Sequence, residues 1–94
     1  MEYNGIPFQN NAPEPNDYKI WVRTSVYPYE VYKYCDNLNG WILIAVWDQG
    51  RVGNEEPTSK HNGILWIDTS TTPAVLKMYN KNENTWYVLD AQCN

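Results

Sequence analysis

Histidine, cysteine and basic residues are scarce in this chain of 94 residues, and each scarcity excludes a class of protein. The single histidine, His61, and the two cysteines, Cys35 and Cys93, leave few ligands for a metal site. Seven Lys and Arg stand against eleven Asp and Glu, a net charge of −4, so the basic patch of a nucleic-acid surface is not expected. No apolar run approaches the length of a membrane helix. We therefore expect no metal, no cofactor, no nucleic-acid partner and no membrane partner.

The first residues lack the basic segment and the apolar core of a signal peptide. We therefore expect the product to begin in a cytoplasm, where free thiols are the default state of Cys35 and Cys93. A disulfide between these two residues is the less favoured alternative.

Catalytic motifs are missing from the sequence as well. His61 stands in a polar segment with neither a nucleophile nor an orienting acid beside it, which indicates a solvated loop residue. Asp48, Glu55 and Glu56 do not follow the spacing of a calcium-binding loop and indicate surface charge. No phosphate-binding loop, dinucleotide fingerprint or nucleophile elbow occurs. We expect a protein without catalytic residues, and not an enzyme.

What the chain does contain is aromatic side chains, with eight Tyr and five Trp, arranged in short apolar runs. Residues 64–68, 75–79 and 85–89 are three such runs, and they are separated by segments rich in Thr, Ser, Pro and Asn. Short apolar runs between turn-forming residues are typical of a three-stranded antiparallel meander. Residues 63–89 are therefore predicted to form one.

An earlier copy of this unit precedes it, because residues 18–43 align with residues 63–88. The identities are Trp21, Thr24, Ser25, Pro28 and Trp41 with Trp66, Thr69, Ser70, Pro73 and Trp86 at an offset of 45, and Val31 and Lys33 with Val75 and Lys77 at an offset of 44. The change of offset places one extra residue in the first loop of the earlier copy. A repeat of this length predicts one supersecondary unit used twice.

The sequence thus predicts an all-β fold built from two tandem three-stranded antiparallel meanders. They are expected to pack either as a small sandwich or as a single six-stranded sheet. The expected segments are an extended N-terminal arm at 1–17, the first meander at 18–47, a polar connecting loop at 48–62, and the second meander with a short tail at 63–94. The nearly continuous apolar run at 41–47 is expected to be a strand buried on both faces at the centre of the sheet.

Two groups of residues are candidates for contact with other molecules. In the arm, Tyr3, Ile6 and Phe8 are unusual for a solvated tail. They would either anchor the arm on a neighbouring subunit or, as the simpler alternative, pack along the edge of their own domain. The second group consists of aromatic residues that would face an interface or a glycan: Trp21, Trp66, Trp86, Tyr27 and Tyr29.

Packing within the repeat is the favoured interpretation of the Trp residues, because they recur at the same places in both copies. A lysine such as Lys77 would then lie over the Trp of a neighbouring strand.

The later copy also resembles a known group of repeats. Residues 63–70, GILWIDTS, are followed by Pro73, Leu76, Lys77, Asn80 and Trp86. This pattern is similar to the G-x-L-W-x-D-T-S repeats, continued by P, L-K, N and W, in small structural proteins of tailed bacteriophages. These occur in head and tail fibres, collars, baseplates and decoration proteins. The earlier copy departs from the pattern, with Arg23 in the place of Asp68.

The resemblance implies a virion structural protein that is assembled in the host cytoplasm. It would form homo-oligomers and contact other virion proteins through its arm and aromatic faces. An alternative of another class is a carbohydrate-binding module that recognises a bacterial surface glycan. Exposed Trp rings on one face would favour the glycan, and rings covered by a partner chain would favour assembly. A phage-encoded inhibitor of a host protein is a third alternative.

Overall fold

The structure is a computed structural model of the chain and describes residues 2–48, 50–58 and 60–89. Nine strands lie in the described residues: β1 (Glu2–Tyr3), β2 (Ile6–Gln9), β3 (Ile20–Arg23), β4 (Tyr29–Cys35), β5 (Gly40–Trp47), β6 (Arg51–Gly53), β7 (Leu65–Asp68), β8 (Val75–Asn80) and β9 (Thr85–Val88). One turn of 3₁₀ helix, η1 (Asp36–Leu38), joins β4 to β5. The prediction of an all-β fold is confirmed.

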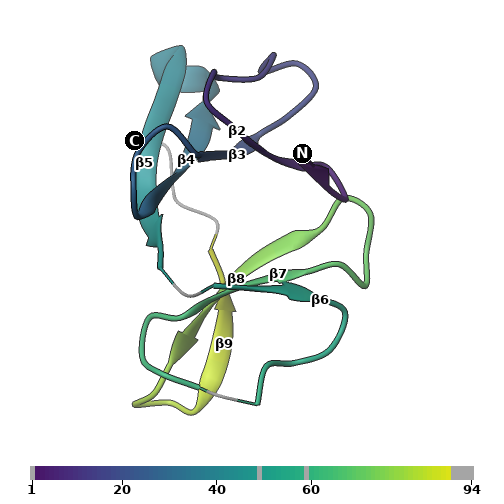
Figure 1. Cartoon of the computed structure of the whole chain (residues 1–94), viewed down its shortest axis with the longest axis vertical. Coiled ribbons are helices and arrows are strands. Elements are labelled where there is room, and N and C mark those ends of the chain that lie inside the picture. Colours follow the sequence, from purple (N-terminus) through teal and green to yellow (C-terminus); the bar gives the residue numbers. More distant parts are fainter. Residues whose placement is uncertain (1, 49, 59, 90–94) are drawn as a thin grey trace.

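The strands form two sheets, one above the other in Figure 1. The first sheet has the order β1-β2-β3-β4-β5 and the second has the order β6-β7-β8-β9. The antiparallel pairs β3-β4-β5 and β7-β8-β9 are the two predicted meanders. Of the two packings that the sequence allowed, the structure therefore has the sandwich-like one and not a single sheet.

The two meanders correspond at a constant offset of 45 residues, as the strand register shows. Val22 pairs with Val31 in the first sheet, and Ile67 pairs with Leu76 in the second. The turns agree too, because Asn39 and Asn84 both adopt a left-handed conformation, with φ of 50° and 54°. Asn tolerates this conformation better than most residues, which explains why it recurs at the turn.

The predicted change to an offset of 44 residues in the second strand is wrong. That alignment placed Val31 on Val75 and Lys33 on Lys77, whereas the pairing places Val31 on Leu76. Two residue identities favoured the shifted alignment. A shift of the alignment by one residue, however, would turn every side chain of the strand to the other face of the sheet. The pairs Arg23–Glu30 and Asp68–Val75 therefore enclose loops with the same spacing, and the earlier copy has no extra residue there.

Each copy also contains a fourth strand, which precedes the meander and runs parallel to its first strand. β2 pairs with β3 and β6 pairs with β7. The carbonyl at the end of each added strand accepts two hydrogen bonds: Gln9 O from Trp21 Nε1 at 2.9 Å and Thr24 N at 3.1 Å, and Gly53 O from Trp66 Nε1 at 2.9 Å and Thr69 N at 3.1 Å. The repeating unit thus has four strands, and β2 and β6 come from segments expected to be an arm and a loop.

Both sheets contribute to one hydrophobic core. Its buried members are Ile6, Val22, Val31, Leu65, Ile67 and Leu76. Val22 and Val31 are the counterparts of Ile67 and Leu76, so the two copies present the same face to each other. In the first meander strand of each copy, alternate apolar residues face this core: Val22 in β3, and Leu65 and Ile67 in β7.

The expectation for the run at 41–47 is wrong in its position. β5 lies at the edge of the first sheet and pairs only with β4 among the described strands. One face of the strand covers the core, where Ile44 and Ala45 pack against the buried cluster. The other face is open, and Leu43 and Val46 are each 49% exposed. A continuous apolar run therefore marks a one-sided strand here, with hydrophobic residues left in solvent.

The N-terminal segment belongs to the domain. Ile6 is only 2% exposed within the shared core, and Tyr3 and Phe8 pack against that core. β1 lies beside the green loop between β7 and β8 in Figure 1, where Asn4 O accepts a hydrogen bond from Ala74 N at 2.8 Å. The Asn4 side chain donates to Thr69 O at 3.0 Å. The segment thus packs within its own domain and bridges the two sheets, and its contact with a neighbouring subunit stays a prediction.

Candidate functional site

The aromatic residues that recur in both copies pack on one another. Trp21 lies 5.6 Å from Trp41 between ring centroids, and Trp66 lies 5.2 Å from Trp86, both pairs in edge contact. In the second copy Lys77 Nζ lies 4.7 Å from the centroid of the Trp66 ring, which confirms the predicted lysine over a Trp. The recurring Trp residues thus form a local cluster in each sheet.

These clusters leave little Trp surface for another molecule. Trp21 and Trp66 are 7% and 6% exposed, and their indole N–H groups already donate to backbone carbonyls. Trp86 is partly buried and donates to Glu56 Oε2 at 2.8 Å. Neither Trp21 nor Trp66 offers the face of its ring to a glycan or a partner in this structure.

Tyr27 and Tyr29 lie in and after the loop between β3 and β4 and differ in their surroundings. Tyr27 is almost fully exposed, and its ring meets the ring of Tyr29 edge-on at 6.4 Å. Tyr29 is half-buried and belongs to a further group of rings that is centred on Phe8. Of the five residues selected as an interface or glycan-facing group, Tyr29 is thus the one that lines a pocket.

We call this group the aromatic pocket, and it is lined by Tyr3, Phe8, Thr24, Tyr29, Trp47, Gly50 and Val52. Its volume is about 470 Å³. The ring of Phe8 lies 5.0 Å from Tyr3, 6.4 Å from Tyr29 and 5.4 Å from Trp47, at interplanar angles between 80° and 89°. The pocket therefore joins strands of both sheets around one Phe ring.

Sequence reasoning selected Tyr3, Phe8 and Tyr29 but did not bring them together, and it gave Trp47 no role. A signal for Trp47 was nevertheless present. The other four Trp residues form two pairs at an offset of 45, whereas the position 45 residues after Trp47 is Gln92. Trp47 is therefore the one Trp that the repeat does not require, and such a residue is a better candidate for function than a repeated one.

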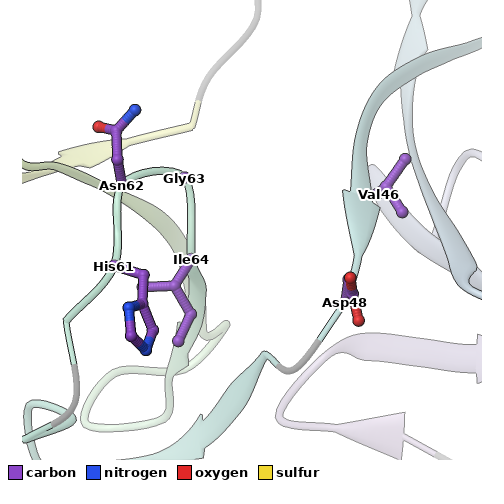
Figure 2. Close-up of a pocket in the computed structure, with 6 residues that line it drawn as sticks. All are labelled: Val46, Asp48, His61, Asn62, Gly63 and Ile64. Atoms are coloured by element: carbon purple, nitrogen blue, oxygen red, sulfur yellow. The ribbon is translucent and has the colours of Figure 1, made fainter.

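A second hollow is polar and lies between the end of β5 and the loop before β7. Figure 2 shows Val46 and Asp48 on one side and the loop of His61, Asn62 and Ile64 on the other. The volume of this hollow is about 240 Å³. The carboxylate of Asp48 and the imidazole of His61 lie on opposite sides and do not form a catalytic pair in this geometry.

Asp68 carries the strongest electrostatic perturbation among the described residues. Its carboxylate accepts hydrogen bonds from Lys77 Nζ at 2.8 Å and from Ser70 Oγ at 2.6 Å and N at 3.0 Å. These bonds, that of Lys77 first, lower the pKa of Asp68 from 3.8 to about 2 although burial opposes the shift. Because Lys77 also covers Trp66, the residues Trp66, Asp68, Ser70 and Lys77 of the second copy are linked by direct contacts within the sheet.

The cysteines and groups of possible metal ligands are the remaining candidates for chemistry. Cys35 is buried at the end of β4 and is disulfide-bonded, which contradicts the expectation of a free thiol at this position. Cys93 lies outside the described residues.

Across residues 2–48, 50–58 and 60–89, no three His, Cys, Asp or Glu side chains gather as a metal site would require. The same residues contain no helix that is long and apolar enough to cross a membrane.

Comparison of the chain with protein-family models, with curated proteins and with solved structures finds no match.

Proposed function

We propose that this chain is a structural subunit of a bacteriophage particle, an accessory component of a fibre, collar, baseplate or capsid surface. It would assemble with further copies of itself and with other virion proteins. Two lines of support carry the proposal. The resemblance of residues 63–86 to phage structural repeats supports the virion role. Assembly is supported by the outer edge of β5, which pairs with no further strand among the described residues.

The edge of β5 is the observation that favours assembly most. β5 is eight residues long and contains neither a charged residue nor a proline. Proteins normally protect an edge strand with charge, proline or a covering segment, because its free N–H and C=O groups pair with other strands. In β5 these groups stand beside the exposed side chains of Leu43 and Val46. A strand from another subunit would extend the sheet and cover both side chains.

The second sheet offers a corresponding edge. β9 pairs only with β8 among the described strands, and its Val88 is exposed. Val88 is the counterpart of Leu43 at the offset of 45 residues. Equivalent apolar edges on the two sheets suit a protein that forms homo-oligomers, since every subunit presents a similar surface twice. We therefore propose the strand edges as the assembly surfaces, because Ile6 of the N-terminal segment is already buried within its own domain.

The substitution Leu43→Lys tests assembly through β5. We expect the parent chain to form oligomers in a dilution series measured by light scattering. The variant should remain monomeric to concentrations at least about 10-fold higher, because a lysine on an edge strand opposes pairing. The fold should survive, since Leu43 is exposed in the single subunit.

Leu38→Lys is the matched control. Leu38 is 52% exposed, similar to Leu43, but lies in η1 and outside β5. It should leave the oligomer unchanged. A parent chain that is folded and monomeric throughout the series would refute assembly through β5. The virion role has a separate test, because the chain should be detected by mass spectrometry in purified particles of the phage that encodes it, and its absence there would refute that role.

A further inference from the structure

The aromatic pocket combines apolar rings with unused polar groups. Trp21, Trp66 and Trp86 all direct their indole N–H groups to acceptors within the chain. By contrast, no hydrogen bond among the described residues engages the hydroxyl groups of Tyr3 and Tyr29 or the indole N–H of Trp47. Three rings of the pocket therefore carry hydrogen-bonding groups that are free to contact a bound molecule.

The chemistry of the lining selects the class of ligand. The residues that line the pocket carry no charge, so an ionic ligand would find no counter-ion there. A sugar ring suits such a lining, because its C–H faces pack on aromatic rings while its hydroxyl groups bond to Tyr and Trp N–H or O–H groups. The volume of about 470 Å³ is within the range of small-molecule sites.

We propose that the aromatic pocket binds a neutral hexopyranose unit of a glycan. This proposal is independent of assembly through β5. It also differs from the sequence-based expectation of a glycan on Trp21 and Trp66, because those rings are covered.

The second copy has smaller side chains at positions equivalent to two of these aromatic residues. The counterpart of Phe8 is Val52, since both precede the end of the parallel strand by one residue and pair with Val22 and Ile67. The counterpart of Tyr29 at the offset of 45 is Ala74. The second copy thus builds the same framework with smaller side chains. The large rings of the first copy are an addition to the framework and create the pocket.

Gly50 also shapes the aromatic pocket, through its contact with Trp47. A Cβ atom at Gly50 would lie 2.5 Å from Cζ2 of Trp47, so only glycine allows the chain to pass against that ring. The close passage fixes the indole at the wall of the pocket. A side chain at this position would displace Trp47 and reshape the pocket without removing any aromatic residue.

Saturation-transfer NMR with N-acetylglucosamine, galactose and glucose tests the proposal. We expect transfer to at least one of these sugars, with a dissociation constant in the millimolar range that is usual for weak ligands of one ring, on the order of 1–10 mM. Tyr29→Ala should weaken this binding at least ~10-fold, because it removes one wall and one hydroxyl group. The variant should fold, since its counterpart in the second copy is Ala74.

Two further variants keep the test decisive. Tyr87→Ala, on the exposed part of β9, removes a Tyr outside the pocket and should leave binding unchanged. Tyr29→Phe retains the ring and should bind more tightly than Tyr29→Ala and more weakly than the parent. The absence of transfer to any of the three sugars at ~10 mM would overturn the proposal. Equal binding by the parent and Tyr29→Ala would also overturn it. Aromatic rings attract cations as well, so tight binding of tetramethylammonium without binding of the sugars would contradict the proposal.

Discussion

Asp68 is the only buried charged residue in the described part of the chain, and its ion pair with Lys77 makes stability depend on pH. The folded state lowers the pKa of Asp68 to about 2 from 3.8, so the folded state binds this proton less readily than the unfolded chain. The resulting stability is fully present above the unfolded pKa. It is lost as the pH falls from about 4 to about 2.

Asp68→Asn should remove this contribution. We expect the free energy of unfolding at pH 7 to fall by roughly 1–2 kcal/mol, a value that allows for partial screening of Lys77 by solvent. The curve of stability against pH should also become flatter between about pH 4 and pH 2. Urea denaturation at several pH values measures both effects.

Asp36→Asn serves as the control for this measurement. Asp36 also pairs with a lysine, Lys19 at 3.2 Å, but its side chain is 78% exposed. An exposed pair of this kind contributes little, so stability should change by less than about 0.5 kcal/mol. Equal losses in the two variants would show that burial of Asp68 is not the cause.

At the scale of the strand, the two copies use the same hydrogen bond at the same place. The indole N–H groups of Trp21 and Trp66 each donate at 2.9 Å to the last carbonyl of the parallel strand. Trp21→Phe and Trp66→Phe should therefore destabilise the fold by similar amounts, about 1–2 kcal/mol each. Chemical denaturation of the two variants beside the parent measures this.

Trp86→Phe is the comparison for these variants. Its indole donates to Glu56, an exposed carboxylate that water solvates when the partner is removed. The loss of free energy should be smaller than for Trp21 and Trp66. If Trp21→Phe and Trp66→Phe differ by more than about 1 kcal/mol, the two copies are not energetically equivalent at this bond.

The strands show how far the sequence predicts this fold. Alternating apolar residues and recurring turn residues predicted both meanders, because such patterns are local. β2 and β6 were not predicted, since they are four and three residues long and are defined by pairing with a distant strand. The position of β5 was also not predictable from its own residues. A continuous apolar run does not distinguish a central strand from an edge strand such as β5.

The aromatic pocket could likewise be predicted only in part from the sequence. Tyr3, Phe8 and Tyr29 were selected from the sequence for other contacts, but their meeting with Trp47 depends on the order of strands in the sheet. The comparison of the two copies carries part of this information. Once the offset of 45 residues is known throughout, the aromatic residues without an aromatic counterpart can be found from the sequence alone.

At the scale of the whole molecule, the N-terminal segment decides whether the two sheets hold together. Ile6 is 2% exposed in the core that both sheets share, and β2 supplies the strand next to β3. Asn4 adds hydrogen bonds to Thr69 O and from Ala74 N in the second copy. The segment is thus part of both the core and the connection between the copies.

A chain that begins at residue 10 should therefore fail to fold. If the N-terminal segment served only to join subunits, the shortened chain would instead be a folded monomer. It would lose β1, β2 and the buried side chain of Ile6. Ile6→Ala in the chain of 94 residues gives the graded form of this test and should lower the free energy of unfolding by about 2–4 kcal/mol. Leu38→Ala, at an exposed position, should change it by less than about 0.5 kcal/mol. Circular dichroism and thermal unfolding distinguish the outcomes. A cooperative, native-like transition in the shortened chain would show that the two meanders hold together without their N-terminal bridge.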